Sequence, residues 1–173
     1  MNRTFPNTET VATRAARIRC LFLDVDGVLT DCRLWLAPDG TELKTVHVRD
    51  GLGIKLLLEA GIAVAVISGR PSQAIQRRLE SLGVQHIALQ VADKLPEYER
   101  VRDALGLTDA ECAAMGDDTP DLPLMERVGL ALTVADAHPR ARAVAHWASQ
   151  HDGGFGAVRE AADLVLAARG REV

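Results

Sequence analysis

The chain has 173 residues, of which 47% are hydrophobic and 25% charged, and its formal net charge is −4. This composition is typical of a globular domain and excludes an intrinsically disordered chain. The scattered Lys and Arg residues and the slight acidity argue against a nucleic-acid-binding surface. The length suits one domain with a substantial core.

The cysteines and the N-terminus indicate the compartment. Cys20, Cys32 and Cys112 are an odd number at unrelated spacings, which favours reduced thiols over disulfides or a zinc site. The N-terminus lacks the apolar core of a signal peptide, and no run approaches membrane-spanning length. We therefore expect a cytoplasmic protein without nucleic-acid or membrane partners. Residues 1–17 are expected to form a flexible tail or a short surface helix, and residues 18–170 a single domain.

Strand-like apolar runs alternate with amphipathic segments along the chain. The expected strands are 18–23, 62–67, 84–89, 112–115 and 130–134. The expected helices are at about 52–60, 71–82, 96–105, 120–128 and 157–169, the last within a C-terminal tail and helix at 151–173. This alternation predicts an α/β fold of Rossmann type, a doubly wound parallel sheet with helices on both faces.

One segment interrupts the alternation. Residues 33–37 and 41–48 read as two strands joined by the turn Pro38-Asp39-Gly40, which predicts a β-hairpin flap over residues 33–48. Apolar side chains are frequent in it, namely Leu34, Trp35, Leu36, Val46 and Val48. Because an isolated hairpin is marginally stable, we expect this flap to join subunits of an oligomer. Packing against its own domain is the alternative.

The first strand ends in two carboxylates, Asp24 and Asp26, followed by Gly27. Alternate side chains of a strand point to one face, so the two carboxylates leave the strand end on the same side. At about 4 Å and an effective dielectric constant near 20, their repulsion is roughly 4 kcal/mol. A bound cation or protonation of one carboxylate would relieve it. Exposure of both side chains at a βα turn is the alternative.

Polar residues also follow the other strands, and ligands of doubly wound sheets bind at the carboxyl ends of the strands. They are Ser68-Gly69-Arg70, then Lys94, then Gly116-Asp117-Asp118, with Asp121 one turn later. Together with Asp24 and Asp26 they predict a magnesium–phosphate site. Asp24 and Asp117 are the expected Mg²⁺ ligands, with Asp118 or Asp121 acting directly or through water. Ser68 and Lys94 would bind phosphate, one carboxylate would act as nucleophile, and Asp26 would act as general acid and base.

In order and spacing, these residues resemble the four motifs of the haloacid dehalogenase superfamily of phosphatases. The matching residues are Asp24-Val25-Asp26-Gly27-Val28, Ser68, Lys94 and Gly116-Asp117-Asp118-Thr119-Pro120-Asp121. The resemblance implies Asp24 as nucleophile, Asp26 as acid and base with its backbone carbonyl on Mg²⁺, and Asp117 as the other metal carboxylate. Asp118 and Asp121 would be supporting residues. The short gaps between the motifs leave no room for a cap domain.

Within that superfamily, residues 18–170 resemble the capless, tetrameric phosphatases of 3-deoxy-D-manno-octulosonate 8-phosphate, which serve lipopolysaccharide biosynthesis. The further matching segments are 40–44, 48–54, 68–70, 134–139 and 156–160. The resemblance implies a homotetramer joined through the hairpin and a sugar-acid phosphate as substrate. By the same resemblance, the substrate would contact His47, Val48, Arg49, Asp50, Gly51, Lys55, Arg70 and Arg78 as well as Asp26 and Lys94. An arginine can hold the carboxylate of such a substrate bidentately.

Alternatives remain at this stage. Arg49, Lys55 and Arg78 could be solvated surface charges. The related phosphatases of 2-keto-3-deoxynononate 9-phosphate tend to carry Glu at the position of Arg70, so Arg70 favours the octulosonate ester over this alternative. A receiver-like phospho-accepting domain is the alternative from another class, although the strand at 84–89 ends without the Asp that a receiver requires. Relatives commonly have Arg at the position of Phe155, and Phe155 cannot bind an anion.

Overall fold

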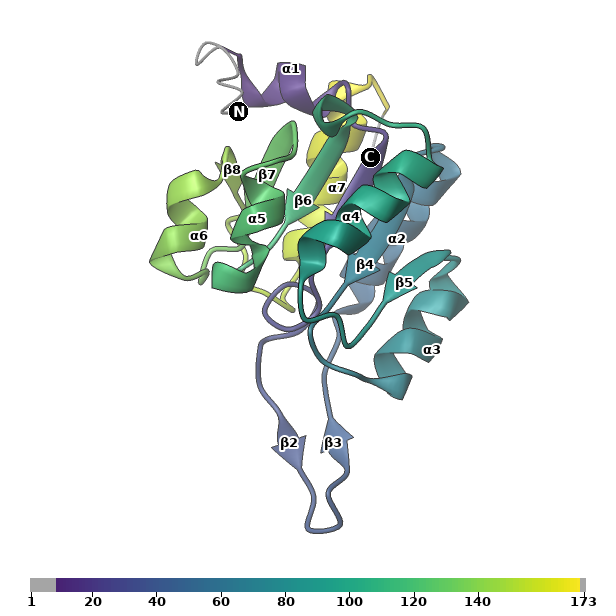
Figure 1. Cartoon of the computed structure of the whole chain (residues 1–173), viewed down its shortest axis with the longest axis vertical. Helices are drawn as coiled ribbons and strands as arrows, with labels where there is room; N and C mark the ends of the chain where they lie inside the picture. Colours follow the sequence, from purple (N-terminus) through teal and green to yellow (C-terminus); the bar gives the residue numbers. More distant parts are fainter. Residues whose placement is uncertain (1–8, 172–173) are drawn as a thin grey trace.

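The computed structural model describes residues 9–171. Their main element is a six-stranded parallel sheet in the order β5-β4-β1-β6-β7-β8 (Figure 1). The strands are β1 Cys20–Leu23, β4 Ala63–Ile67, β5 His86–Ala88, β6 Cys112–Met115, β7 Leu130–Thr133 and β8 Trp147–Ala148. This sheet confirms the predicted doubly wound α/β fold, and no cap domain is present within the described residues.

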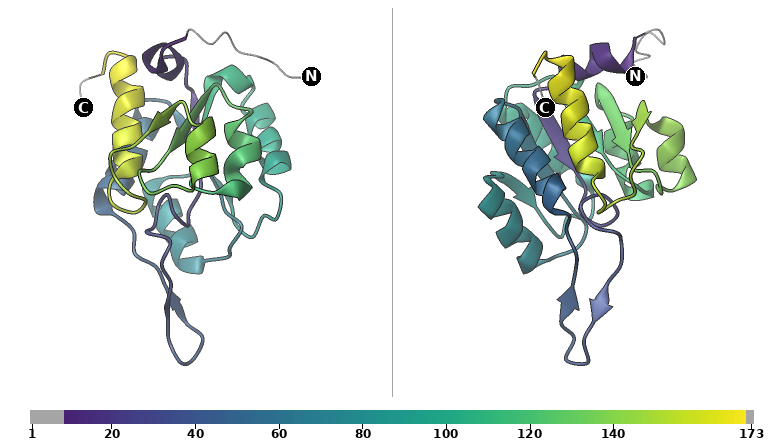
Figure 2. Two further views of the ribbon diagram at one scale, coloured as in Figure 1. Left: turned by 90° about the vertical axis from the view of Figure 1, so that its left-hand side faces the viewer. Right: turned by 180° about the vertical axis from the view of Figure 1, so that it is seen from behind.

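Helices cover both faces of the sheet. On one face, α2 Val48–Glu59 and α7 Ala157–Ala168 lie side by side, with α3 Gln73–Leu82 next to α2 (Figure 2). On the other face lie α4 Lys94–Ala104 and α5 Leu122–Met125 (Figure 1). Every residue of β1, β6 and β7 is buried, as expected for strands covered on both faces. The smaller elements are α1 Val11–Ala15, η1 Asp109–Glu111, η2 Thr119–Asp121 and α6 Pro139–Val144.

Local capping sets where the helices near the carboxyl edge begin. The Asp93 side chain accepts a hydrogen bond from the Leu95 N–H, which starts α4 at Lys94. Ser72 starts α3 in the same way, by accepting from the Ile75 N–H. These caps fix the first turns of both helices close to the ends of β4 and β5.

The structure differs from the sequence expectation around the hairpin. α2 begins at Val48 rather than near residue 52, and the hairpin strands shorten to β2 Trp35–Leu36 and β3 Glu42–Leu43. Asp50 lies in the first turn of α2, where a carboxylate favours helix over strand. Two further elements, α6 and β8, were not expected, because β8 has two residues and α6 six, too few for a periodic signal.

Part of the expected tail is packed against the domain. Within residues 1–17, Val11–Ala15 form α1, and both Arg14 and Ala15 are buried. Nη1 of Arg14 donates a hydrogen bond to the Gly129 carbonyl over 2.6 Å. Of the two expectations for this segment, residues 11–15 match the short helix, and residues 1–8 lie outside the described residues.

The hairpin extends away from the sheet at the end opposite to α1 and to the last turn of α7 (Figures 1 and 2). Its strands pair in antiparallel fashion, with Trp35 opposite Leu43. Trp35 is 66%, Leu36 68% and Leu43 61% exposed. The hairpin flap is thus present as predicted, and the described part of the same chain leaves these apolar side chains uncovered.

A close contact between two loops fixes the segment after β1. The N–H of Gly154 donates to the Val28 carbonyl over 3.0 Å, and the N–H of Gly153 donates to Oδ1 of Asp136 over 3.0 Å. A Cβ on Gly153 would lie 1.9 Å from the Gly27 carbonyl oxygen. Residue 153 must therefore be glycine for the C-terminal loop to pack against the loop that carries Asp24 and Asp26.

No helix within residues 9–171 is both long enough and apolar enough to cross a membrane.

Candidate active site

The predicted strand-end residues line one pocket at the carboxyl edge of the sheet. Asp24 follows β1, Ser68 follows β4, Lys94 starts α4 after β5, and Asp117 follows β6. The pocket is lined by Asp24, Asp26, Cys32, Ser68, Gly69, Arg70, Val91, Ala92, Lys94, Asp117, Asp118, Pro120 and Asp121. The parallel topology therefore gathers the four motifs, although they are up to 97 residues apart in the sequence (Asp24 to Asp121).

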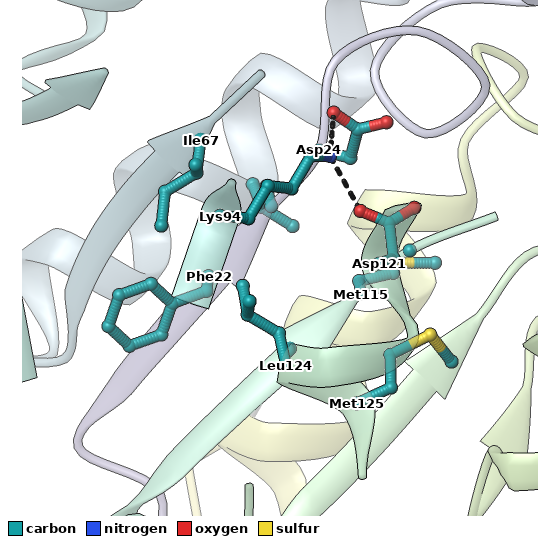
Figure 3. A pocket seen from close by; sticks show the side chains of 11 residues that line it. Phe22, Asp24, Ile67, Lys94, Met115, Asp121, Leu124 and Met125 are labelled. Atoms are coloured by element: carbon teal, nitrogen blue, oxygen red, sulfur yellow. Dashed lines mark hydrogen bonds and ion pairs between the residues drawn. The ribbon is translucent and has the colours of Figure 1, made fainter. Parts of the chain in front are cut away.

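Lys94 joins two of the carboxylates. Its Nζ lies 2.7 Å from Oδ1 of Asp24 and 2.6 Å from Oδ1 of Asp121, as Figure 3 shows. The three side chains are 5%, 10% and 6% exposed respectively, so water screens these charges weakly. The shortest contact between Lys94 and Asp24 is made through one carboxylate oxygen, Oδ1.

Asp121 is the residue that orders the Asp117 loop. Its Oδ2 accepts hydrogen bonds from the N–H groups of Asp117 over 3.1 Å and Asp118 over 3.3 Å. With Oδ1 on Lys94, both oxygens of Asp121 are engaged by donors of the protein. Asp121 is thus placed to support the loop, the role that the resemblance implied for it.

Two glycines allow the carboxylates of Asp117 and Asp121 to approach the backbone closely. A Cβ on Gly27, whose φ is +96°, would lie 2.1 Å from Oδ2 of Asp117. A Cβ on Gly116 would lie 2.3 Å from the Cβ of Asp121. The glycines of both motifs are therefore required by the close approach of the carboxylates, and Gly27 also by its left-handed backbone.

Burial and mutual repulsion change the acidity of the cluster. Burial, followed by the charges of Asp24 and Asp121, raises the pKa of Asp117 to about 8. Burial and the charge of Asp121 raise the pKa of Asp24 to about 6, although Lys94 opposes the change. Burial would lower the pKa of Lys94, but the two carboxylates that it contacts raise it. Lys94 alone does not balance the negative charge of the cluster.

The donor set fits a hard divalent cation. Asp24, Asp117 and Asp121 each offer a carboxylate oxygen, and these oxygens lie within 4.8 Å of one another. Mg²⁺ prefers such oxygen ligands and usually takes one or two carboxylates. Because Asp121 is engaged by Lys94 and backbone N–H groups, Asp24 and Asp117 are the carboxylates with oxygens left for a metal.

Ser68 and Thr30 supply the hydroxyls near the cluster. The Ser68 side chain is buried, and its Oγ accepts the Arg70 N–H over 3.4 Å at the pocket wall. The Thr30 hydroxyl donates to the Val25 carbonyl over 3.3 Å and accepts from the Gly27 N–H over 3.4 Å. Ser68 therefore faces the pocket, whereas Thr30 fixes the loop that carries Asp24 and Asp26.

Asp26 has a different set of partners, and the nearest of them comes from the hairpin. Nζ of Lys44 lies 2.6 Å and 2.8 Å from the two Asp26 oxygens. Nε of Arg70 lies 3.9 Å from Asp26, and its Nη2 donates to Glu42 over 2.8 Å. Sequence reasoning gave Lys44 and Glu42 no role. The available signal was the pair of opposite charges spaced i, i+2 in the second half of the hairpin.

The expected substrate contacts fall into separate places. Three of them, Asp26, Arg70 and Lys94, line the pocket that contains Asp24, Asp117 and Asp121, which we call the carboxylate pocket. Four others line a second pocket at the base of the hairpin, namely His47, Asp50, Gly51 and Arg78. Arg49 lines a third pocket together with Phe155, while Val48 and Lys55 are exposed and line none of the three. One chain therefore does not bring the whole predicted set together.

Asp50 has a structural contact that the sequence did not reveal. Its Oδ1 accepts the Arg159 N–H over 2.8 Å at the start of α7. Gly53, one turn later, faces the same helix, since its Cβ would lie 3.0 Å from the Arg159 Cα. Part of the segment 48–54 thus serves the packing of α2 against α7. Oδ2 of Asp50 and Nδ1 of His47 are buried without a hydrogen-bond partner among the described residues.

Comparison with known sequences agrees with this geometry. The family of haloacid dehalogenase-like hydrolases matches residues 86–159. The 3-deoxy-D-manno-octulosonate 8-phosphate phosphatase of Yersinia pestis is 42% identical over 95% of this chain and 88% of its own length. That of Escherichia coli K12 is 41% identical over 96% of this chain and 88% of its own length. Matches over nearly the whole chain exclude the receiver-like alternative.

Solved structures give the same result. The structure of the Y. pestis phosphatase has a TM-score of 0.91 at 42% identity and covers 93% of this chain and 87% of its own. The 3-deoxy-D-manno-octulosonate 8-phosphate phosphatase of Moraxella catarrhalis was solved in complex with a magnesium ion, a phosphate ion and KDO (3-deoxy-D-manno-octulosonate). Its structure has a TM-score of 0.90 at 37% identity, and 92% of both chains is covered. The chain belongs to the 3-deoxy-D-manno-octulosonate 8-phosphate phosphatase family of haloacid dehalogenase-like hydrolases.

Proposed function

We propose that this protein is a Mg²⁺-dependent phosphatase that hydrolyses 3-deoxy-D-manno-octulosonate 8-phosphate to KDO and phosphate. The observation that carries the proposal is the buried group of carboxylates around Lys94, which shares one pocket with Ser68 and Arg70. The M. catarrhalis relative, which binds magnesium, phosphate and KDO, supports the choice of cofactor and substrate. We place the enzyme in the cytoplasm, a compartment that the free thiols of Cys20, Cys32 and Cys112 support.

In the proposed mechanism, Asp24 is the nucleophile. Its free oxygen attacks phosphorus, the bond to the sugar oxygen breaks, and an aspartyl phosphate forms. Lys94 holds the other oxygen and fixes the direction of attack. When bound by Asp24, Asp117 and the backbone carbonyl of Asp26, Mg²⁺ supplies positive charge that stabilises the phosphoryl oxygens.

Asp26 moves the protons. It donates one to the departing sugar oxygen, and it then takes one from the water that attacks phosphorus and releases phosphate from Asp24. The Ser68 hydroxyl and the Lys94 ammonium bind the phosphoryl oxygens. Asp118 and Asp121 support the loop that carries Asp117, as the hydrogen bonds of Asp121 indicate.

We propose that Arg70 recognises the carboxylate of the sugar acid. It lies on the rim of the carboxylate pocket, with its side chain 48% exposed, and it can pair with the substrate carboxylate. The ester of 2-keto-3-deoxynononate 9-phosphate, which carries the same type of carboxylate, remains the alternative substrate.

We propose a homotetramer joined through the hairpin. The exposed Trp35, Leu36 and Leu43 form an apolar surface that an intersubunit contact would cover. Because His47, Asp50, Gly51 and Arg78 line a different pocket from Asp24, we propose that they serve the active site of a neighbouring subunit. Val48, Arg49 and Lys55 lie on the same helix, α2, and Arg49 and Lys55 would contribute positive charge.

The first prediction concerns substrate choice. We expect kcat/KM for the octulosonate ester to exceed that for hexose 6-phosphates by about 100-fold, because hexose phosphates lack the carboxylate that Arg70 would bind and a hydrogen bond to a charged group contributes about 1.5–3 kcal/mol. The Arg70→Met variant should lose most of this preference, whereas Arg77→Met, at an exposed arginine outside the pocket, should retain it. Equal turnover of hexose phosphates by the natural protein would refute the octulosonate assignment and leave the phosphatase class intact.

The second prediction concerns pH and metal. Folding raises the pKa values of Asp24 to about 6 and of Asp117 to about 8, so the folded protein binds more protons than the unfolded chain between pH 4 and 8. In EDTA, the Tm should therefore fall as the pH rises from 5 to 9, and Mg²⁺ should abolish this fall. Asp117→Asn should weaken the pH dependence. A Tm in EDTA that rises over this range would contradict the electrostatic account of the cluster.

The third prediction tests the shared site. Asp24→Asn and Arg78→Ala subunits, each inactive alone, should regain up to about a quarter of the natural activity when co-expressed, because random assembly places an intact Asp24 beside an intact Arg78 in that share of sites. The measurement is kcat per subunit of the mixed oligomer after two-tag purification. Activity no higher than the mean of the two parent variants would show that Arg78 acts within its own subunit.

A further inference from the structure

Lys44 is less exposed than its neighbours Leu43 and Thr45 in the hairpin. Its side chain is 4% exposed, whereas Leu43, directly before it, is 61% exposed. The long apolar stem of Lys44 is covered, and its ammonium group reaches both oxygens of Asp26 at 2.6 Å and 2.8 Å. A lysine side chain is buried only when its charge is paired, as it is here with a carboxylate that is itself 18% exposed, and removal of one partner from such a pair is costly.

A second contact connects the same strand to the pocket. Glu42 and Lys44 are two residues apart, so both side chains leave the extended segment on the same side. Glu42 accepts a hydrogen bond from Arg70, and Arg70 in turn lies 3.9 Å from Asp26. The hairpin therefore meets the pocket through a chain of alternating charges, of which the pair Lys44–Asp26 is the shortest and least exposed.

The contact restricts where the Asp26 carboxylate can point. A carboxylate held at both oxygens by one ammonium group has lost its free rotation about the side-chain bonds. Without Lys44, the remaining cation is Arg70 at 3.9 Å, too far for a hydrogen bond. Proton transfer requires Asp26 to lie within hydrogen-bond reach of the sugar oxygen, so an error of 1 Å in its position is costly.

We propose that Lys44 is a positioning residue for Asp26, so that the hairpin of each subunit completes the acid–base apparatus of its own active site. This inference rests on the proposed function, since it assigns a task to Asp26. It also gives the hairpin a second role besides subunit contact. Its apolar residues face outward, while Lys44 and Glu42 connect it to the carboxylate pocket.

The test compares two leaving groups. The variants are Lys44→Met and Lys44→Arg, with Arg33→Met as the matched control, because Arg33 is an exposed cation of the same hairpin that does not line the pocket. The readout is kcat/KM for a sugar phosphate, whose leaving oxygen needs a proton, and for p-nitrophenyl phosphate, whose leaving group does not. The parameter kcat/KM reports steps up to departure of the leaving group, which separates the acid step from the later hydrolysis.

We expect Lys44→Met to lower kcat/KM for the sugar phosphate by about 100-fold and to affect the aryl phosphate much less, because a general acid typically contributes 10²–10⁴-fold. Lys44→Arg should recover part of the loss, and Arg33→Met should behave as the natural protein. In an Asp26→Asn background, Lys44→Met should lower kcat/KM for the sugar phosphate by less than about threefold more. A residue that acts through Asp26 has no effect once Asp26 cannot transfer protons.

Three outcomes would overturn the proposal: equal losses on both substrates, additive losses in the Asp26→Asn background, or a loss confined to KM. The last would mean that Lys44 binds substrate directly. Size-exclusion chromatography and Tm measurements accompany each variant, and Lys44→Gln replaces Lys44→Met if that variant does not assemble. Two controls on the natural protein and on Asp24→Asn distinguish a failure of this inference from a failure of the proposed function: the natural protein must hydrolyse the octulosonate ester, and Asp24→Asn must be inactive.

Discussion

The charge balance around Lys94 is the constraint on which the rest of the structure depends. The sheet brings Asp24, Asp117 and Asp121 to one edge, and Lys94 contacts two of them. When ionised, three carboxylates and one ammonium group carry a net charge of −2, which is the deficit that a divalent cation balances. The raised pKa values of Asp24 and Asp117 express the same deficit in the metal-free protein.

Such a cluster must be held rigidly in place. The loops around it do so mainly through close backbone contacts at glycines. Gly27 and Gly116 admit the carboxylates of Asp117 and Asp121, which leave no space for a Cβ. Gly153 packs against Gly27 from the C-terminal loop, and the His138 N–H donates to the Asp117 carbonyl over 2.8 Å. Loops separated by more than a hundred residues therefore fix the same few atoms, which keeps repelling carboxylates in place.

The sequence predicts the carboxylate pocket well for a physical reason. Four of its residues, Asp24, Ser68, Lys94 and Asp117, each follow a strand in the sequence. Because parallel strands all end at the same edge of the sheet, residues in that position lie close to one another in the fold. The predicted strands agree with β1, β4, β5, β6 and β7 to within two residues. β8 was missed because two residues carry no periodic signal.

The contacts of the hairpin and of α2 could not be predicted in the same way. Where a hairpin lies relative to a sheet depends on tertiary contacts, so the pair Lys44–Asp26 has no local pattern that would reveal it. Asp50 was expected to contact the substrate, and nothing in the sequence indicates that its Oδ1 also accepts a hydrogen bond from the start of α7. Arg78 was expected to line the substrate site, and within one chain it lines the pocket at the base of the hairpin, since helix periodicity does not tell which cavity a side chain reaches.

The most direct test of the central claim is to trap the covalent intermediate on Asp24. The Asp26→Asn variant, with Mg²⁺ and phosphorus-labelled p-nitrophenyl phosphate, should form the aspartyl phosphate and hydrolyse it slowly, because this leaving group needs no proton but water still needs a base. After acid quench and proteolysis, the account predicts label on the peptide that contains Asp24, and no label when Asp24→Asn is added. Label on another residue, or phosphate release without any labelled peptide, would contradict the account.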